Sequence, residues 1–194
     1  MHVIGIDLAG SEKRQTGFCI LDGMKAYTSV LYTDEEIIDK IEEVRPDIIA
    51  IDAPLSLPEG RKSIEDRTNV HLRECDKELL KRRIKFFPIT LGPMRKLTQR
   101  GIELKKILES KGFRVIEVYP GGAQDVLKIP RKQRGLDKLK EGLKMLKITG
   151  LTKEMNDHEL DAVTSAFVGK LFLEKKSEIL GDQKIGIVMP KINN

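Results

Sequence analysis

The sequence predicts one α/β domain over residues 1–194. It is expected to have a mixed five-stranded sheet, with three antiparallel strands before the parallel ones, flanked by helices. Three apolar segments with short links open the chain, which is typical of antiparallel strands. Helical patterns then alternate with short continuous apolar runs, as in parallel strands joined by crossovers and buried on both faces. At 40% hydrophobic residues, a chain of this length can bury the core of one such domain.

The first three strands are expected over 2–9, 16–22 and 25–32. The turn signal Asp22-Gly23 joins the last two as a tight hairpin. The first strand has one carboxylate, Asp7, inside an otherwise apolar run. An ionised carboxylate in a buried strand is costly unless a cation, several hydrogen-bond donors or a metal ion pairs with it. Asp7 is therefore the first candidate for a functional residue.

A helix and a fourth strand follow. Thr33 fits an N-cap, with Glu36 three residues later, and Pro46 ends the helical pattern. The run DIIAIDAP then predicts a short buried strand that ends at Asp52. A helix followed at once by such a strand is half of a crossover unit.

Residues 55–106 interrupt this alternation and are expected to form a largely helical, basic insertion. They contain helix candidates at 72–83 and from about 102 to 110. Between residues 61 and 106 there are fourteen Lys or Arg against six Asp or Glu, a net +8, whereas the rest of the chain has 21 against 24, a net −3. This local excess of positive charge favours an anionic partner.

The α/β pattern resumes after the insertion. The run FRVIEVYP predicts a fifth strand with one carboxylate, Glu117, and a basic stretch at 128–134 and a helix at about 136–146 follow. A long final helix opens at Asn156, and the tail KIGIVMP is expected to add an edge strand.

Acidic residues at the start of the final helix border its apolar stripe. Asp157 and Asp161 lie about 40° apart on a helical wheel, so both are expected beside the sheet. If the first, fourth and fifth strands are neighbours, their carboxyl ends lie at one edge, where ligands bind in open α/β sheets. The carboxylates that would then converge are Asp7, Asp52, Glu117 and one or both of Asp157 and Asp161.

Converging carboxylates predict a metal centre. Hard oxygen ligands suit Mg²⁺ or Mn²⁺, and two such ions could activate a water and stabilise the leaving oxygen in phosphodiester hydrolysis. The five carboxylates above are the predicted metal ligands.

The order of these elements resembles the RNase H fold, and DHELDA resembles the last acidic motif of its Holliday-junction resolvase branch. A closer similarity, to a family of uncharacterised predicted nucleases of this fold, is found in the motifs GIDLAGS, IDAPLSLP, RECDKELLKRRIKFFP, GPMR, IEVYPGGAQ and HELDAV. The resemblance implies a Mg²⁺- or Mn²⁺-dependent nuclease acting on structured or branched nucleic acid. It makes Asp7, Asp52 and Asp161 the catalytic residues, with Asp157 or His158 beside Asp161, while Glu117 could instead lie on the substrate side.

The basic segment supplies the predicted nucleic-acid contacts. A row at helical spacing, followed by further cations, could contact successive phosphates. With the arginine of GPMR, the predicted set is Arg73, Lys77, Lys81, Arg82, Arg83, Lys85 and Arg95. The alternative is a solvated face, in which acidic residues of the same helix pair with the row. Phe86 and Phe87 could stack on bases or pack in the core.

Structural roles compete with the functional ones for several acids. Asp157 follows a capping Asn156 and could stabilise the helix dipole, and Asp52 could accept hydrogen bonds in a turn. Glu117 could form a buried ion pair with an arginine of the insertion. His158 could be a surface or capping histidine.

Two other functions stay open. One is a nucleic-acid-binding protein whose acidic cluster is not catalytic. The other is a phosphotransferase of the actin and sugar-kinase branch, because DLAGS loosely resembles a phosphate loop. No GxxxxGK[ST] pattern occurs, and that branch generally needs a duplicated fold.

The sequence also gives expectations for the location, thiols, source and oligomeric state of the protein. No apolar run approaches the roughly 18 residues of a membrane span, and no secretory signal pattern opens the sequence, so a cytoplasmic protein is expected. Cys19 and Cys75 are expected to be buried thiols. The 34% of charged residues favours a heat-adapted source. A homodimer would suit a substrate with two-fold symmetry.

Overall fold

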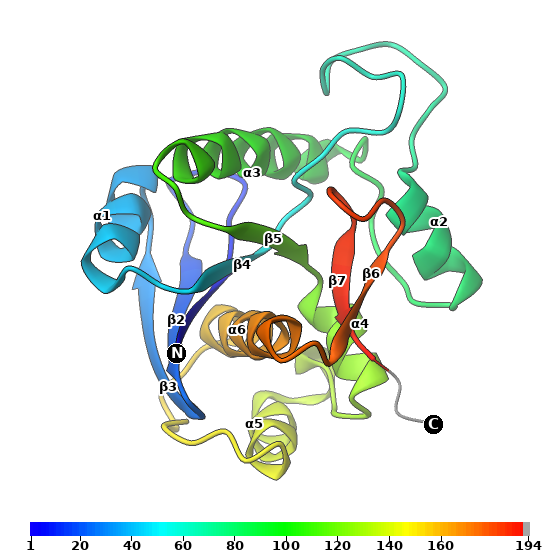
Figure 1. Cartoon of the computed structure of the whole chain (residues 1–194). Coiled ribbons are helices and arrows are strands. Elements are labelled where there is room, and N and C mark those ends of the chain that lie inside the picture. Colours follow the sequence, from blue (N-terminus) through cyan, green and yellow to red (C-terminus); the bar gives the residue numbers. More distant parts are fainter. Residues whose placement is uncertain (192–194) are drawn as a thin grey trace.

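Seven strands form one mixed sheet. They are β1 (His2–Asp7), β2 (Thr16–Asp22), β3 (Lys25–Leu31), β4 (Ile48–Asp52), β5 (Val115–Val118), β6 (Ser177–Leu180) and β7 (Ile187–Pro190). The structure is a computed structural model and describes residues 1–191. The strand order is β3-β2-β1-β4-β5-β7-β6 (Figure 1). The pairs β1/β4, β4/β5 and β5/β7 are parallel, whereas β1/β2, β2/β3 and β6/β7 are antiparallel.

The sheet is therefore larger than predicted. The mixed arrangement of antiparallel and then parallel strands is confirmed, but the prediction of five strands is wrong. The tail KIGIVMP is not an edge strand, because β7 lies inside the sheet between β5 and β6. Among the strands of residues 1–191, β6 pairs with β7 alone and has the edge position instead.

Helices cover both faces of the sheet. They are α1 (Asp34–Val44), α2 (Glu74–Lys81), α3 (Gly92–Ser110), α4 (Pro120–Val126), α5 (Leu136–Met145), α6 (Asp157–Leu173) and the 3-10 turn η1 (Lys132–Arg134). α1 and α3 lie on one face, and α4, α5 and α6 lie on the other (Figure 1). None of the helices in residues 1–191 combines the length and apolar character that crossing a membrane requires.

Alternation along the strands decides which face each side chain enters. On β1, Val3 packs in the core beneath α6, and Ile4 and Ile6 pack in the core beneath α1 and α3. Because successive side chains of a strand point to opposite faces, Asp7 lies on the α6 face with Val3. Asp52 is its register partner on β4 and shares that face.

The same argument separates Glu117 from these residues. Glu117 of β5 is level with Ile51, which packs in the α1/α3 core, and not with Asp52. Its side chain therefore enters the opposite face of the sheet.

α6 is the central helix of its layer. Its residues from Leu160 to Gly169 are all buried. The approach is close because two strand positions are glycine. A Cβ at Gly5 would lie 2.0 Å from the Ala162 carbonyl oxygen, and one at Gly17 would lie 2.0 Å from that of His158. Glycine at these positions allows the first turns of α6 to lie directly on β1 and β2.

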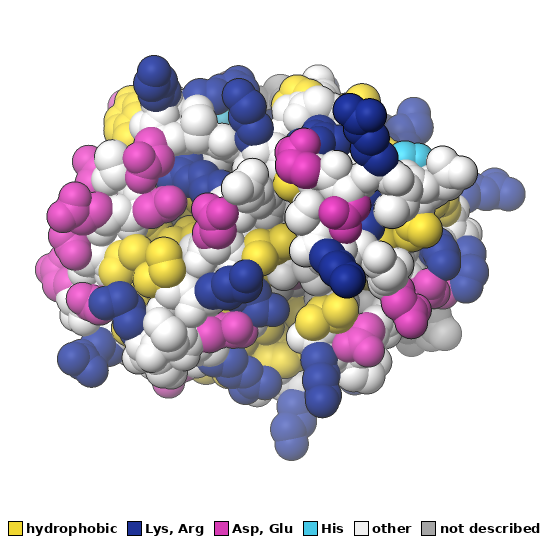
Figure 2. Space-filling model, turned by 90° about the horizontal axis from the view of Figure 1, so that it is seen from above, with side chains coloured by type: hydrophobic (Ala, Val, Ile, Leu, Met, Phe, Trp, Pro, Cys, Tyr) yellow, Lys and Arg dark blue, Asp and Glu magenta, His cyan; other side chains and the backbone are white. Residues whose placement is uncertain are grey.

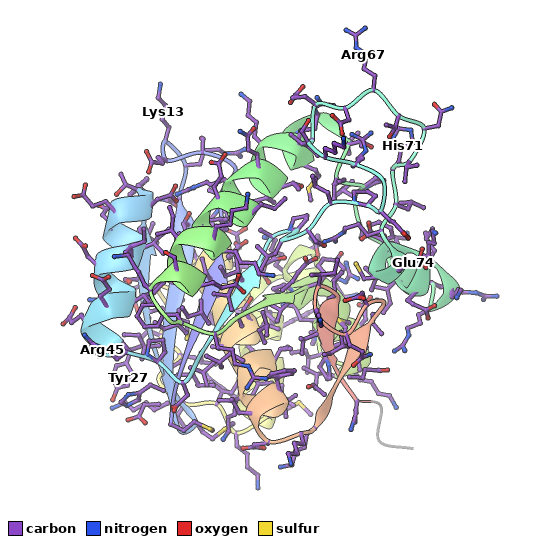
Figure 3. The ribbon with its side chains drawn as sticks, turned by 45° about the horizontal axis from the view of Figure 1, so that its top comes forward. Lys13, Tyr27, Arg45, Arg67, His71 and Glu74 are labelled. Carbon is purple, nitrogen blue, oxygen red and sulfur yellow. The ribbon has the colours of Figure 1, made fainter. Side chains whose placement is uncertain are left out.

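The segment 55–106 is less helical than expected. Residues 53–73 form no helix, and Arg67 and His71 of this loop project outward from the body of the molecule (Figure 3). α2 is shorter than the candidate at 72–83. α3 begins at Gly92 instead of about 102, with Pro93 in its first turn, where proline is well tolerated.

α3 belongs to the core of the domain. Leu104 and Leu108 are fully buried against Ile4, Ile6 and Ile51 of the sheet. The guanidinium of Arg100 adds hydrogen bonds to Asp34 and to the carbonyl oxygens of Ala9 and Tyr32, at 2.8–2.9 Å. The helix thus ties the β1–β2 loop to the start of α1.

Local signals in the sequence are confirmed. Thr33 and Glu36 form a capping box at the start of α1, and Asn156 caps α6. Gly23 adopts φ +60° in the β2–β3 hairpin. Cys19 and Cys75 are buried free thiols.

Five helices end in an unusual way. One residue after α1 and two residues after α2, α4, α5 and α6, a residue other than glycine has a positive φ, and these residues are Arg45, Arg83, Lys128, Lys147 and Lys175. All five are cationic, which favours a position beside the carbonyl groups at a helix C-terminus.

Candidate acidic site

Three carboxylates from different elements meet at the carboxyl edge of the sheet. Asp7 ends β1 and Asp52 ends β4, in register and on the α6 face. The capped start of α6 brings Asp161 to the same place, where burial, then the neighbouring charges of Asp7 and Asp161, hold the pKa of Asp52 well above its usual range. The convergence predicted for Asp7, Asp52 and Asp161 is therefore present in the structure.

Asp7 is paired with a histidine. His158 Nδ1 lies 2.7 Å from Asp7 Oδ2, and the two side chains are 37% and 14% exposed. The hydrogen bond to Asp7 raises the pKa of His158, although partial burial opposes this. His158 is thus the side-chain partner of Asp7 and not simply a capping residue.

Asp161 is held by two donors from the segment after β5. Lys132 Nζ lies 2.9 Å from one carboxylate oxygen of Asp161 and 3.0 Å from Asp157. The amide of Gln124 donates to the other oxygen of Asp161 at 2.9 Å. Burial raises the pKa of Asp161, and attraction to Lys132 opposes that rise.

The pKa values of Lys132 and Asp157 are shifted against the effect of burial. Burial alone would lower the pKa of Lys132, but the charges around it, of which Asp161 contributes most, raise it instead. Burial would raise the pKa of Asp157, but the hydrogen bond from Lys132 lowers it. Asp157 therefore stays ionised at the rim of the cluster.

Asp52 differs from the other two carboxylates. Within residues 1–191, its side chain has no hydrogen-bond or ion-pair partner at contact distance. It also lines a cleft of about 290 Å³, together with Asp161, Lys132 and Gln124. Apolar side chains form another wall of this cleft, namely Leu79, Phe86, Phe87, Met94 and Leu97. A carboxyl group without a contact partner in residues 1–191 thus faces a space large enough for part of a ligand.

Glu117 borders the cluster but has a structural partner: it lines the same cleft as Asp52, and its charge contributes to the raised pKa of Asp52. Arg73 donates to its two carboxylate oxygens at 2.7 and 2.8 Å, and the backbone N–H of Leu55 donates to one of them at 2.7 Å. Arg73 also binds Asp76, and all three side chains are at most 6% exposed. Arg73 and Leu55 already bind its oxygens in this arrangement, so the metal-ligand role of Glu117 stays a prediction. The alternative of a buried ion pair with an arginine of the insertion is what the structure has.

The predicted row of cations does not form. Arg73 is buried at the N-cap of α2, and the other members are mostly paired with acids. The pairs are Lys77–Glu74, Lys81–Glu78, Arg82–Glu178 and Arg95–Glu65. Arg83 and Lys85 are exposed without such a partner among residues 1–191. Figure 2 shows cations interspersed with acids on the face above the sheet, and acids gathered at the left, where α1 lies.

The donor types of the site suit a hard divalent cation. Asp7, Asp52 and Asp161 offer carboxylate oxygens, the usual ligands of Mg²⁺ and Mn²⁺. In the described part of the chain no group of three or more Asp, Glu, His or Cys is already arranged to hold a metal ion. The contacts of His158 and Lys132 explain this, because each occupies an oxygen that a metal ion would use. The catalytic and metal-binding roles of these residues therefore remain predictions.

Two residues of the site were not predicted from the sequence. Lys132 comes from the basic stretch 128–134, where nothing distinguishes it from its neighbours. Gln124 comes from the motif IEVYPGGAQ, which carried the family resemblance without a role for the amide.

The fold and the acidic edge define the class, which is that of RNase H-like α/β domains. Two solved structures are similar to the chain, "T. thermophilus RuvC in complex with Holliday junction substrate" and "Thermus thermophilus RuvC structure", both from Thermus thermophilus. Their TM-scores are 0.53 and 0.52, and each is 14% identical, with 90% of this chain and 96% of the RuvC chain covered. The model of the family described as "Protein of unknown function (DUF429)" matches residues 5–184, so the chain belongs to this family. The search of curated proteins gave no match.

Proposed function

We propose that this protein is a Mg²⁺- or Mn²⁺-dependent nuclease that hydrolyses phosphodiester bonds in structured or branched nucleic acid. The observation that carries the proposal is the convergence of Asp7, Asp52 and Asp161 beside a cleft, where Asp52 has no hydrogen-bond or ion-pair partner among residues 1–191. A buried acid whose pKa is raised by burial and by neighbouring carboxylates, as that of Asp52 is by Asp7 and Asp161, is typical of functional sites.

Each residue of the acidic site would have a distinct role. Asp7, Asp52 and Asp161 would hold the divalent ions, and Asp157 lies close enough, through Lys132, to join them. The ions, when bound, would supply Lewis-acid stabilisation of the phosphodiester and a more acidic water. His158 orients Asp7, and Gln124 orients Asp161. Lys132, which now binds Asp157 and Asp161, would supply a positive charge beside the phosphate.

Branched DNA is the first substrate to test. The similar RuvC structure is described as a complex with a Holliday-junction substrate. At 14% identity this likeness concerns the fold, so it suggests which substrate to try first and does not assign one.

The test compares wild type with Asp7→Asn on labelled single-stranded, duplex and four-way-junction DNA and RNA, with Mg²⁺, Mn²⁺ or chelator. We expect cleavage that needs the metal ion and falls at least about 100-fold in Asp7→Asn, since the variant loses a charged ligand. Asp39→Asn, an exposed acid of α1, is the matched control and should keep full activity. Cleavage by a folded Asp7→Asn protein would refute the proposal.

A second function is favoured by one observation. Lys132 and His158 already compensate part of the acidic cluster, as they would in a nucleic-acid-binding protein whose acids are structural. In that case junction DNA would bind in a salt-dependent manner, no metal ion would promote cleavage, and Mg²⁺ would leave the thermal stability unchanged.

A further inference from the structure

A second cleft, separate from the acidic one, is lined mainly by cations. Its volume is about 580 Å³. The charged side chains of its lining are Arg83, Lys85, Lys128, Arg131, Arg134 and Asp125. Five cations therefore face one carboxylate.

Most of this positive charge is uncompensated. Asp125 pairs with Arg131 at 2.5 Å. In residues 1–191, none of Arg83, Lys85, Lys128 and Arg134 has a carboxylate at ion-pair distance, and all four are exposed. The cations of α2 differ in this respect, since Lys77 and Lys81 each pair with a glutamate. Free cations gathered in a concave surface focus a positive potential that attracts anions.

Helix ends account for only part of this cluster. Arg83 and Lys128 follow α2 and α4, where a cation interacts well with the helix dipole. Lys85 and Arg134 have no such role. Arg134 is in η1, which begins with Lys132 of the acidic site.

The basic cleft adjoins the acidic one. Arg131 and Gln133 line both clefts, and Lys132 between them binds Asp157 and Asp161. A ligand that extends from the basic cleft would therefore reach the carboxylates along η1. An isolated phosphate would use only part of this path, whereas a polymer of phosphates would follow all of it.

We propose that the basic cleft binds the phosphodiester backbone of the nucleic acid and directs it to the acidic site. The inference rests on the proposed function for its ligand class. Of the set predicted from the sequence it keeps Arg83 and Lys85, and it adds Lys128 and Arg134, so that these four residues are the main phosphate contacts in place of the row on α2.

The test measures binding of fluorescein-labelled four-way-junction DNA by anisotropy, in EDTA, over a series of NaCl concentrations. Lys128→Gln/Arg134→Gln removes two cations from the cleft. Arg45→Gln/Lys147→Gln is the matched control, because it removes one Arg and one Lys that are exposed, follow helices and have left-handed torsions. Figure 3 shows Arg45 at the end of α1, on the surface of the molecule.

We expect the cleft variant to bind more weakly and to lower the slope of log affinity against log salt by about 2. The control should bind like wild type, and melting curves should show both variants folded. Equal losses in the two variants, or no junction binding by wild type, would overturn the proposal. Displacement of the junction by inorganic phosphate at matched ionic strength would also do so, since the cleft would then hold a free anion.

This experiment is independent of catalysis. Chelator prevents metal-dependent cleavage, and Asp7→Asn is expected to bind the junction as wild type does. A protein that binds through the cleft but never cleaves would sustain this inference and refute the nuclease.

Discussion

Arg73 connects helix α2 to strand β5. Its guanidinium lies between Glu117 of β5 and Asp76 of α2, away from water. Removing one partner of a buried ion pair leaves the other charges uncompensated, which costs more than the pair contributes. The residue that was expected at a nucleic-acid surface therefore has a structural role.

Arg73→Met is expected to lower the free energy of unfolding by about 3–5 kcal/mol, because two carboxylates stay buried without a cation. Urea unfolding followed by circular dichroism measures the change. Arg73→Met/Glu117→Leu should recover part of the loss. A single-variant loss below about 1 kcal/mol, as for an exposed pair, would contradict this role.

At the same scale, the sequence predicted the acids of the site better than their partners. Asp7 and Asp52 were predictable because each ends an apolar strand, and strand alternation then places both on one face. Glu117 shares that strand pattern but is one residue out of phase, and phase between strands is set by register, which the sequence does not contain. Lys132 lies in a loop, where no periodicity indicates its direction.

Among the elements, α6 has the position that is most tightly constrained by close backbone contacts. It lies on β1 and β2 where glycine leaves no side chain between the backbones, and this contact sets the distance from His158 and Asp161 to Asp7.

Gly17→Ala is expected to disturb both stability and the site. A Cβ there would lie 2.0 Å from the carbonyl oxygen of His158, so the start of α6 must shift. We expect a loss of about 1–3 kcal/mol in unfolding free energy, together with reduced cleavage. Gly92→Ala, which has open space around it, is the control. An unchanged melting temperature in Gly17→Ala would show that the contact is not close in solution.

α2 is attached to the edge strand β6 by Arg82 and Glu178, with N–O distances of 2.7 and 2.9 Å. The hydrogen bond from Arg82 lowers the pKa of Glu178 below its ordinary 4.5. A carboxyl group whose pKa is lower in the folded state stabilises the protein above the unfolded pKa, and this contribution is lost as the pH falls through the folded pKa.

Arg82→Gln should therefore reduce stability by up to about 1 kcal/mol at neutral pH, with the difference from wild type shrinking as the pH falls below 4.5. Urea unfolding of both proteins over a pH series measures it. A difference that stays constant with pH would mean that Arg82 acts through packing alone.

The elements that sequence patterns misplaced have physical explanations. α3 was predicted to begin late because Gly92 and Pro93 usually mark a break, yet both are compatible with a first helical turn. β7 was expected at an edge because it is the last strand of the sequence, and a sequence pattern does not indicate which strands lie beside it. Its position between β5 and β6 depends on contacts across the sheet.

For the whole molecule, residues 55–106 are expected to fold together with the rest of the domain. Leu104 and Leu108 of α3 complete the core on one face of the sheet, and Arg100 bonds to residues of two other segments.

A chain in which a short Gly-Ser linker replaces residues 55–106 is expected not to fold, because the α1/α3 core would be open to water. Wild type should melt in a single cooperative transition by circular dichroism and calorimetry. A cooperative transition in the shortened chain would instead make the segment a separable insertion.

The place of β7 also has a consequence for the order in which the sheet can be assembled during synthesis. β6 leaves the ribosome before β7, yet within residues 1–191 β7 is the strand with which it pairs. The earlier strand therefore cannot join the sheet until the later one has been made. Until residue 190 has emerged, β5 presents an unpaired edge to the cell, which is the stage at which the nascent chain is most open to aberrant strand pairing.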